Sequence, residues 1–229
     1  GPISNLTTLL ENNGFVISKT GLDAKKVDAC SVMFTSATEK NRSMVFLTSG
    51  TSAVRSRRDL AHELGHQVLH SWMSREDFEE NREIIEHEAD LFASHFLMPG
   101  DAMERESFAV DSLNSLLLMK KRWGASMQNI LYHLRDLECI DSSLFDKLSF
   151  NFYHRGWKSR EPLDDEISQE KPELIKDAIT MLVENNVKTA VDIAEDSCLP
   201  KSELASLCGL PKSFFEAKNI NRVSLQLVK

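Results

Sequence analysis

The spacing of apolar residues changes period along the first half of the chain. Residues 3–13 have the apolar spacing of a short helix, whereas Val27–Phe34 and Met44–Thr48 alternate in the manner of paired strands. Two longer segments after Thr48 return to helical spacing. Strands followed by helices predict an α+β domain in which a small sheet packs on two helices.

A second helical region follows Pro99 and Gly100, which we expect to end the preceding helix. Ser126 is a suitable N-cap for the next helix. The apolar face of that helix would carry Ile130, Leu131, Leu134 and Leu137. One more helix is predicted from Ser143 to about His154, which would complete a domain covering residues 1–158.

The remaining chain divides into an acidic connector and a group of short helices. Residues 159–171 are acidic and contain Pro162, as is typical of a linker. Residues 172–229 form the predicted all-helical module. Its expected helices are Pro172–Glu184, Ala190–Asp196 and Lys201–Leu207, with Pro200 at the start of the last.

Charge restricts the partners that this module and the whole chain can bind. The pattern SELASLCGLPKSFFE resembles a helix-turn-helix unit with Gly209 in the turn. Acidic residues outnumber basic ones in the tail, and the net charge is −8, so packing or substrate docking is favoured over DNA reading, which stays open. A basic cluster of Arg55, Arg57 and Arg58 fits solvated or acid-paired roles better than phosphate binding.

Length and composition fit a protein that works in water. With 229 residues and 41% hydrophobic content, the chain can bury one good core and a small appended module. No apolar run approaches the roughly 20 residues that span a bilayer, and no signal-peptide pattern opens the chain. We therefore expect a cytoplasmic protein without a membrane partner.

The pentapeptide His62-Glu63-Leu64-Gly65-His66 specifies a chemistry. Histidines four residues apart share one helix face, about 6 Å apart along the axis, so both imidazoles can reach one metal ion. Glu63 points about 100° round the helix and can address a water on that metal. Zinc lowers the pKa of such a water from about 16 towards about 7, and a neighbouring carboxylate can then take its proton. The motif predicts zinc-dependent peptide hydrolysis.

A catalytic zinc takes three protein ligands, so a third ligand must be found. His70 continues the spacing but lies about 12 Å from His62 along an unbroken helix, too far to share one ion. Some zinc proteases turn the chain at a glycine after the motif, whereas Gln67–Leu69 continue the helix here. His87 and His95 are expected to be exposed or locally hydrogen-bonded rather than bound to metal.

Glu86 is the better candidate, because it lies in the second long helix, predicted over Asn81–Met98. The buried stripe of this helix would contain Ile85, Ala89, Phe92 and Phe96. Glu86 would project near that stripe, whereas Glu88 faces away from it. One turn later, Asp90 could accept a hydrogen bond from a ligand histidine and fix its tautomer. The alternative is a pair of solvated acids.

The segments SAVRSRRDLAHELGHQVLH and IEHEADLFASHFLMP resemble the ImmA/IrrE family of zinc-dependent endopeptidases. The resemblance extends to PISNLTTLLENNGFVI, to KVDACSVMF, and to WGASMQNILYHLRDLECIDSSLFDKL with its RGWKSREP end, so it covers most of the chain. It implies a zincin-like fold with three Zn²⁺ ligands and one general base. The ligands would be His62, His66 and Glu86, and the base would be Glu63.

The chain departs from the family pattern in two places. Asp90 stands where the family often has asparagine, and Arg58 replaces a usual aromatic residue, but neither change removes a ligand or the base. The resemblance implies that the partner is a helix-turn-helix transcriptional repressor, whose cleavage would switch on genes after stress or DNA damage. The alternative is a regulator that binds its partner or DNA without hydrolysis. Tyr132, Tyr153 and His154 stay open as oxyanion donors.

Four cysteines are scattered without CxxC spacing and are predicted to be reduced, buried thiols: Cys30, Cys139, Cys198 and Cys208. Cys30 lies in the strand predicted ahead of the active-site helix, and zincins usually bind substrate as an added strand along such an edge. An alternative is that Cys30 faces the cleft, where its thiol would sense oxidation or block the metal.

Overall fold

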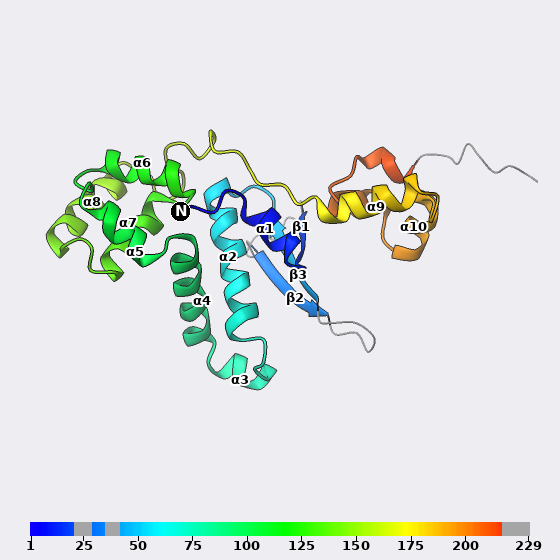
Figure 1. Cartoon of the computed structure of the whole chain (residues 1–229), viewed down its shortest axis with the longest axis horizontal. Coiled ribbons are helices and arrows are strands. Elements are labelled where there is room, and N and C mark those ends of the chain that lie inside the picture. Colours follow the sequence, from blue (N-terminus) through cyan, green and yellow to red (C-terminus); the bar gives the residue numbers. More distant parts are fainter. Residues whose placement is uncertain (21–28, 35–41, 217–229) are drawn as a thin grey trace, which may run out of the picture.

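A three-stranded sheet and two long helices form the centre of the computed structural model, which describes residues 1–20, 29–34 and 42–216 (Figure 1). The strands are β1 (Val16–Thr20), β2 (Ala29–Phe34) and β3 (Arg42–Thr48). β3 lies in the middle, parallel to β1 and antiparallel to β2. The predicted pairing of β2 with β3 is confirmed, although residues 27–28 lie outside the described residues, and β1 is an addition.

The sheet packs on helices through one apolar face. Ile17 of β1 is paired with Val45 of β3, and both side chains are buried. They join one core with residues of α1 (Leu6–Asn12) and α2 (Ala53–Leu69). This layering leaves β2 as an edge strand that runs alongside α2.

The helices α2 and α4 (Arg82–Leu97) lie side by side, with the short α3 (Arg75–Glu80) between them in sequence (Figure 1). Gly65 permits their close approach, because a Cβ there would lie 3.2 Å from the Cα of Ala89 and 3.1 Å from Cδ1 of Phe92. The predicted stripe on α4 is buried at Ile85 and Ala89 and half-buried at Phe92 and Phe96.

Four further helices complete the α+β domain: α5 (Gly100–Ser107), α6 (Leu113–Trp123), α7 (Met127–Asp136) and α8 (Ser142–His154). Ser126 caps α7 as predicted, accepting a hydrogen bond from the Asn129 amide at 3.1 Å. Gly100 starts a new helix directly after α4, and α5 and α6 were not anticipated. No helix in the described part of the chain is both long and apolar enough to cross a membrane.

The acidic segment 159–171 packs along the domain, and two of its carboxylates bond to groups of that domain. Glu161 accepts hydrogen bonds from Lys120 Nζ and from the Met127 amide, each at 2.8 Å. Glu170 accepts one from the Thr7 amide at 2.8 Å and also pairs with Arg57. The segment therefore connects the two parts of the chain while bonding to several elements of the first.

The C-terminal helices lie beyond the β1 edge of the sheet (Figure 1). They are α9 (Leu174–Glu184), α10 (Ala190–Ser197), α11 (Lys201–Leu207) and the 3₁₀ helix η1 (Lys212–Phe215). They share a separate small core that includes Ile179, Leu204 and Phe215. Ser18 of β1 donates a 2.6 Å hydrogen bond to the Leu207 carbonyl, which ties α11 to the sheet. Gly209 turns the chain at φ +65°.

Candidate metal centre

Two histidines of α2 and one glutamate of α4 converge at the contact between these helices. The Nε2 atoms of His62 and His66 are 3.0 Å apart. Oε2 of Glu86 lies 3.2 Å from Nε2 of His62 and 3.8 Å from Nε2 of His66. Among the residues that the structure describes, this is the one group of three or more His, Cys, Asp and Glu side chains arranged to hold a metal ion.

The spacing of these atoms fits a tetrahedral zinc ion. Zinc bonds of about 2.0–2.1 Å at tetrahedral angles hold ligand atoms about 3.3 Å apart. The three observed separations of 3.0, 3.2 and 3.8 Å bracket that value. Two imidazole nitrogens with one carboxylate oxygen also form a ligand set that zinc accepts in catalytic sites. The three side chains therefore fit the metal that the sequence predicts.

Asp90 contacts His62 at Nδ1, the ring nitrogen that does not face the cluster. Its Oδ1 lies 2.7 Å from Nδ1 of His62 and accepts a 2.8 Å hydrogen bond from Arg58. A proton on Nδ1 directed at this carboxylate leaves the Nε2 lone pair facing His66 and Glu86. Burial, the largest influence, raises the pKa of Asp90, but the hydrogen bond from His62 and the charge of Arg58 lower it overall.

Glu63 is buried beside the cluster and contacts the edge strand. The hydroxyl of Ser31 in β2 donates a short hydrogen bond to Oε2 of Glu63. Burial is the main cause that raises the pKa of Glu63; the Ser31 bond and His62 oppose the rise, and the Glu86 charge adds to it. Sequence reasoning did not identify Ser31, although the alternation of β2 was the signal that could have placed one of its side chains here.

The two histidines differ in proton affinity. Burial is the largest influence on His62 and lowers its pKa, but the hydrogen bond and charge of Asp90, with the charges of Glu86 and Glu63, raise the pKa overall. Burial and the neighbouring His62 charge lower the pKa of His66. An acid-rich surrounding on one side of the pair thus favours positive charge at His62.

The remaining histidine candidates lie outside the cluster. His87 and His95 are exposed, and the rings of His95 and His133 meet edge to face, with centroids 4.8 Å apart. α2 continues through Leu69 as predicted, and His70 follows as its C-cap. Nε2 of His70 lies 3.0 Å from Glu88, which is the residue predicted to face away from the stripe.

The cysteine and arginine predictions have mixed outcomes. The cysteines within the described residues are free thiols as predicted, but only Cys208 is buried. Cys139 is half-buried and Cys30 and Cys198 are exposed, so the prediction of buried thiols is wrong for these three. Ser31, the neighbour of Cys30, is the β2 residue that contacts Glu63. Arg57 and Arg58 pair with acids, inside the first turns of α2 rather than ahead of it.

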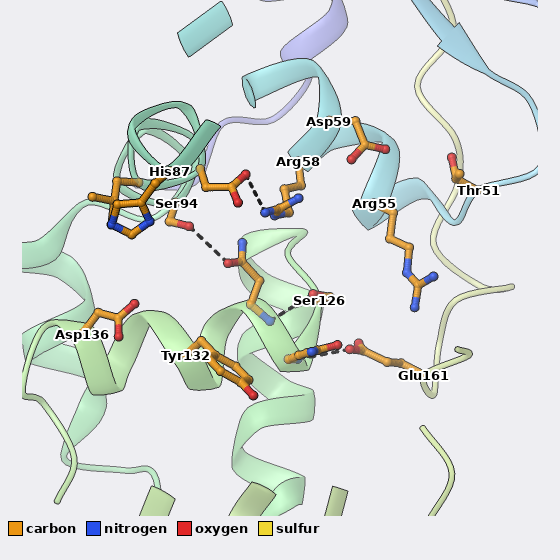
Figure 2. Close-up of a pocket in the computed structure, with 14 residues that line it drawn as sticks. Thr51, Arg55, Arg58, Asp59, His87, Ser94, Ser126, Tyr132, Asp136 and Glu161 are labelled. Atoms are coloured by element: carbon orange, nitrogen blue, oxygen red, sulfur yellow. Dashed lines mark hydrogen bonds and ion pairs between the residues drawn. The ribbon is translucent and has the colours of Figure 1, made fainter. Parts of the chain in front are cut away.

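Asp90, which lies 2.7 Å from His62, also lines a polar cleft. Figure 2 shows this cleft. It has a volume of about 490 Å³ and is formed by the start of α2, the middle of α4 and α7. Arg58 and His87 lie on one side and Tyr132 on the other (Figure 2). The Tyr132 hydroxyl also lies 3.1 Å from that of Tyr153. The cleft is lined by positively and negatively charged side chains and by neutral side chains that can donate or accept hydrogen bonds.

Comparison with known proteins adds one family. Residues 11–135, more than half of the chain, match the family profile described as the IrrE N-terminal-like domain of peptidase M78. The matched range contains both helices of the cluster and the strand that carries Ser31. No curated protein matches the chain.

Proposed function

The chain belongs to the IrrE N-terminal-like domain family of metallopeptidases, peptidase M78, and from that premise we propose that it is a zinc-dependent endopeptidase. His62, His66 and Glu86 are the proposed ligands and Glu63 is the proposed general base. The observation that carries this proposal is the convergence of three ligand atoms within 4.8 Å of one another. Glu63, which follows the first ligand in sequence, lies buried beside them.

When bound, zinc supplies a Lewis acid that polarises the scissile carbonyl and makes a water more acidic. Glu63 takes a proton from the attacking water as the water oxygen bonds to the carbonyl carbon. Glu63 then delivers that proton to the leaving nitrogen as the carbon–nitrogen bond breaks. Burial raises the pKa of Glu63, which makes its carboxylate a stronger base for the first of these two proton transfers. Ser31 keeps the carboxylate in place.

Two surfaces support a polypeptide substrate. β2 is an edge strand of the described sheet and carries Ser31, which bonds to Glu63, so an extended peptide that adds to this edge by backbone hydrogen bonds would lie next to the proposed base. The polar cleft lined by Asp90 offers charged and hydrogen-bonding groups to side chains of a bound polypeptide. The resemblance described above makes a helix-turn-helix transcriptional repressor the proposed partner, cleaved to release gene expression under stress.

We assign residues 1–158 to the peptidase domain, 159–171 to the connector and 172–229 to a module for packing or substrate docking. Direct DNA reading is the weaker alternative for this module. The element after the Gly209 turn is the single 3₁₀ turn η1, which is shorter than the recognition helix of helix-turn-helix proteins.

The decisive experiment replaces the proposed base. Glu63→Gln should keep the fold and bound zinc but lose cleavage of a co-expressed repressor by about 10²–10⁴-fold, because the amide cannot accept the proton. Repressor fragments on a gel are the measurement, and Glu83→Gln, an exposed acid at the start of α4, is the matched control. Retained cleavage by Glu63→Gln would refute the assigned base. A tight complex without fragments, formed by the unaltered chain, would instead support a non-hydrolytic regulator.

A further inference from the structure

The two proposed ligand histidines differ in the group that lies next to Nδ1, the ring nitrogen that does not face the cluster. Nδ1 of His62 faces the Asp90 carboxylate directly at 2.7 Å. Nδ1 of His66 instead lies 3.1 Å from Nδ1 of His70, and no carboxylate of the described residues is hydrogen-bonded to it. The other ring nitrogen of His70, Nε2, is 3.0 Å from Oε2 of Glu88. A second imidazole is therefore interposed between the ligand and its acid.

We propose that His70 and Glu88 are positioning residues that orient His66 for the metal, an inference that rests on the proposed metal centre. The direction of each hydrogen bond follows from the ligand atom. Nε2 of His66 faces the cluster, so its proton is on Nδ1 and is donated to Nδ1 of His70. The remaining proton of neutral His70 is then on Nε2 and is donated to Glu88.

Burial and packing support this arrangement. The His70 side chain is 3% exposed, so a ring nitrogen without a partner there would be costly. Its backbone amide donates to the His66 carbonyl at 2.9 Å, which fixes its distance from the ligand. Phe78 of α3 also packs near the His66 ring, with centroids 5.8 Å apart. Glu88 is 52% exposed, so most of the effect should belong to His70.

A buried histidine can also be a simple structural residue, and the chain contains one for comparison. His133 is buried, and its Nε2 lies 2.8 Å from the Met98 carbonyl. It contacts none of the proposed ligands in the hydrogen bonds and ring contacts of the described residues. Replacement of His133 should therefore cost stability without changing metal affinity, which makes it the matched control.

The test measures zinc affinity by competition with a chromophoric chelator, at one pH and on variants whose folded state is verified by circular dichroism. His70→Phe removes both ring nitrogens and should weaken zinc binding about 10–100-fold. His70→Asn retains an acceptor near Nδ1 and should stay within a few-fold of the unaltered protein. His70→Gln retains only a group near Nε2 and should resemble His70→Phe. Glu88→Ala should have a smaller effect that vanishes in the His70→Phe background.

Each outcome decides the inference. Equal zinc affinity for His70→Asn and His70→Gln would overturn it, and that pair of polar variants remains informative if His70→Phe does not fold. A loss of affinity in His133→Phe as large as in His70→Phe would also overturn it, because the effect would then be one of general stability. Failure of the unaltered protein to bind zinc would instead remove the proposed metal centre itself.

Discussion

Two clusters of charged side chains in this molecule are built in opposite ways. Lys120, Glu161 and Asp164 form one cluster, with side chains 0%, 3% and 7% exposed. In the proposed metal centre, the His62 side chain is 17% exposed and that of Glu86 is 43% exposed. The first cluster is sealed from water, whereas the second is open to it on its acidic side.

The clusters also differ in how their charges are balanced. The Lys120 ammonium donates to Glu161 at 2.8 Å and to Asp164 at 2.5 Å, and Glu161 takes further bonds from two backbone amides of α7. In the proposed metal centre, Oε2 of Glu86 instead faces the two histidines, and its Oε1 lies 3.9 Å from Arg82, whose side chain is 75% exposed. The comparison indicates that a closed ion cluster fixes the fold, while an open one with converging ligand atoms is suited to receive a cation.

Removal of the central lysine should break the closed cluster with the largest effect on stability. Lys120→Met leaves Glu161 and Asp164 buried without their cation, which costs about 3–5 kcal/mol in the free energy of unfolding. Chemical denaturation measures the change. The exposed neighbour Lys121→Met is the control and should shift the same quantity by less than about 0.5 kcal/mol. Similar losses in both variants would contradict a structural role for the cluster.

The sequence predicted one of these clusters and missed the other, because their signals differ in range. His62 and His66 are four residues apart on one helix, so helix geometry alone brings them together. Glu86 followed from the apolar stripe of α4, which fixes the face that meets α2. Local periodicity was therefore enough to predict that these three side chains converge and that the domain is of the α+β class.

Lys120 and Glu161 are 41 residues apart, and no periodic pattern relates them. The acidic composition of residues 159–171 indicated a connector, yet it carries no information on which basic groups its acids meet. The same holds for Ser31, which reaches Glu63 across 32 residues. α6 was missed because its capping box pairs Ser112 with Ser115, instead of the Glu or Gln that makes this signal recognisable in a sequence.

Added zinc should stabilise the molecule through the open cluster alone. At free zinc about 100-fold above the dissociation constant, the free energy of unfolding should rise by about 2.7 kcal/mol, because the ion binds the folded chain and not the unfolded one. Glu86→Gln should lose most of this gain. Lys120→Met should retain it, since the two clusters have no residue in common and the effects of independent sites add. Thermal melts with zinc and with a chelator measure the increments, and equal zinc stabilisation of Glu86→Gln would exclude that glutamate as a ligand.

Acidity should weaken zinc binding by a smaller step that depends on Asp90. Burial is the largest influence on the pKa of His62 and lowers it, but Asp90, Glu86 and Glu63 together raise this pKa above 6.5 overall. Protons should therefore compete with zinc for His62 at pH values above 6.5. Below that pKa, the affinity should fall about tenfold per pH unit for this one proton, or about 1.4 kcal/mol. His66 has a lowered pKa, so protons should compete with zinc for it only at lower pH.

Asp90→Asn removes the charge that favours protonated His62. The zinc affinity of this variant should therefore begin to fall at a lower pH, even though its zinc binding at high pH is weaker than that of the unaltered protein. Chelator competition from about pH 5 to 8 separates the two effects, and an onset that does not move in Asp90→Asn would show that Asp90 does not control the proton on His62.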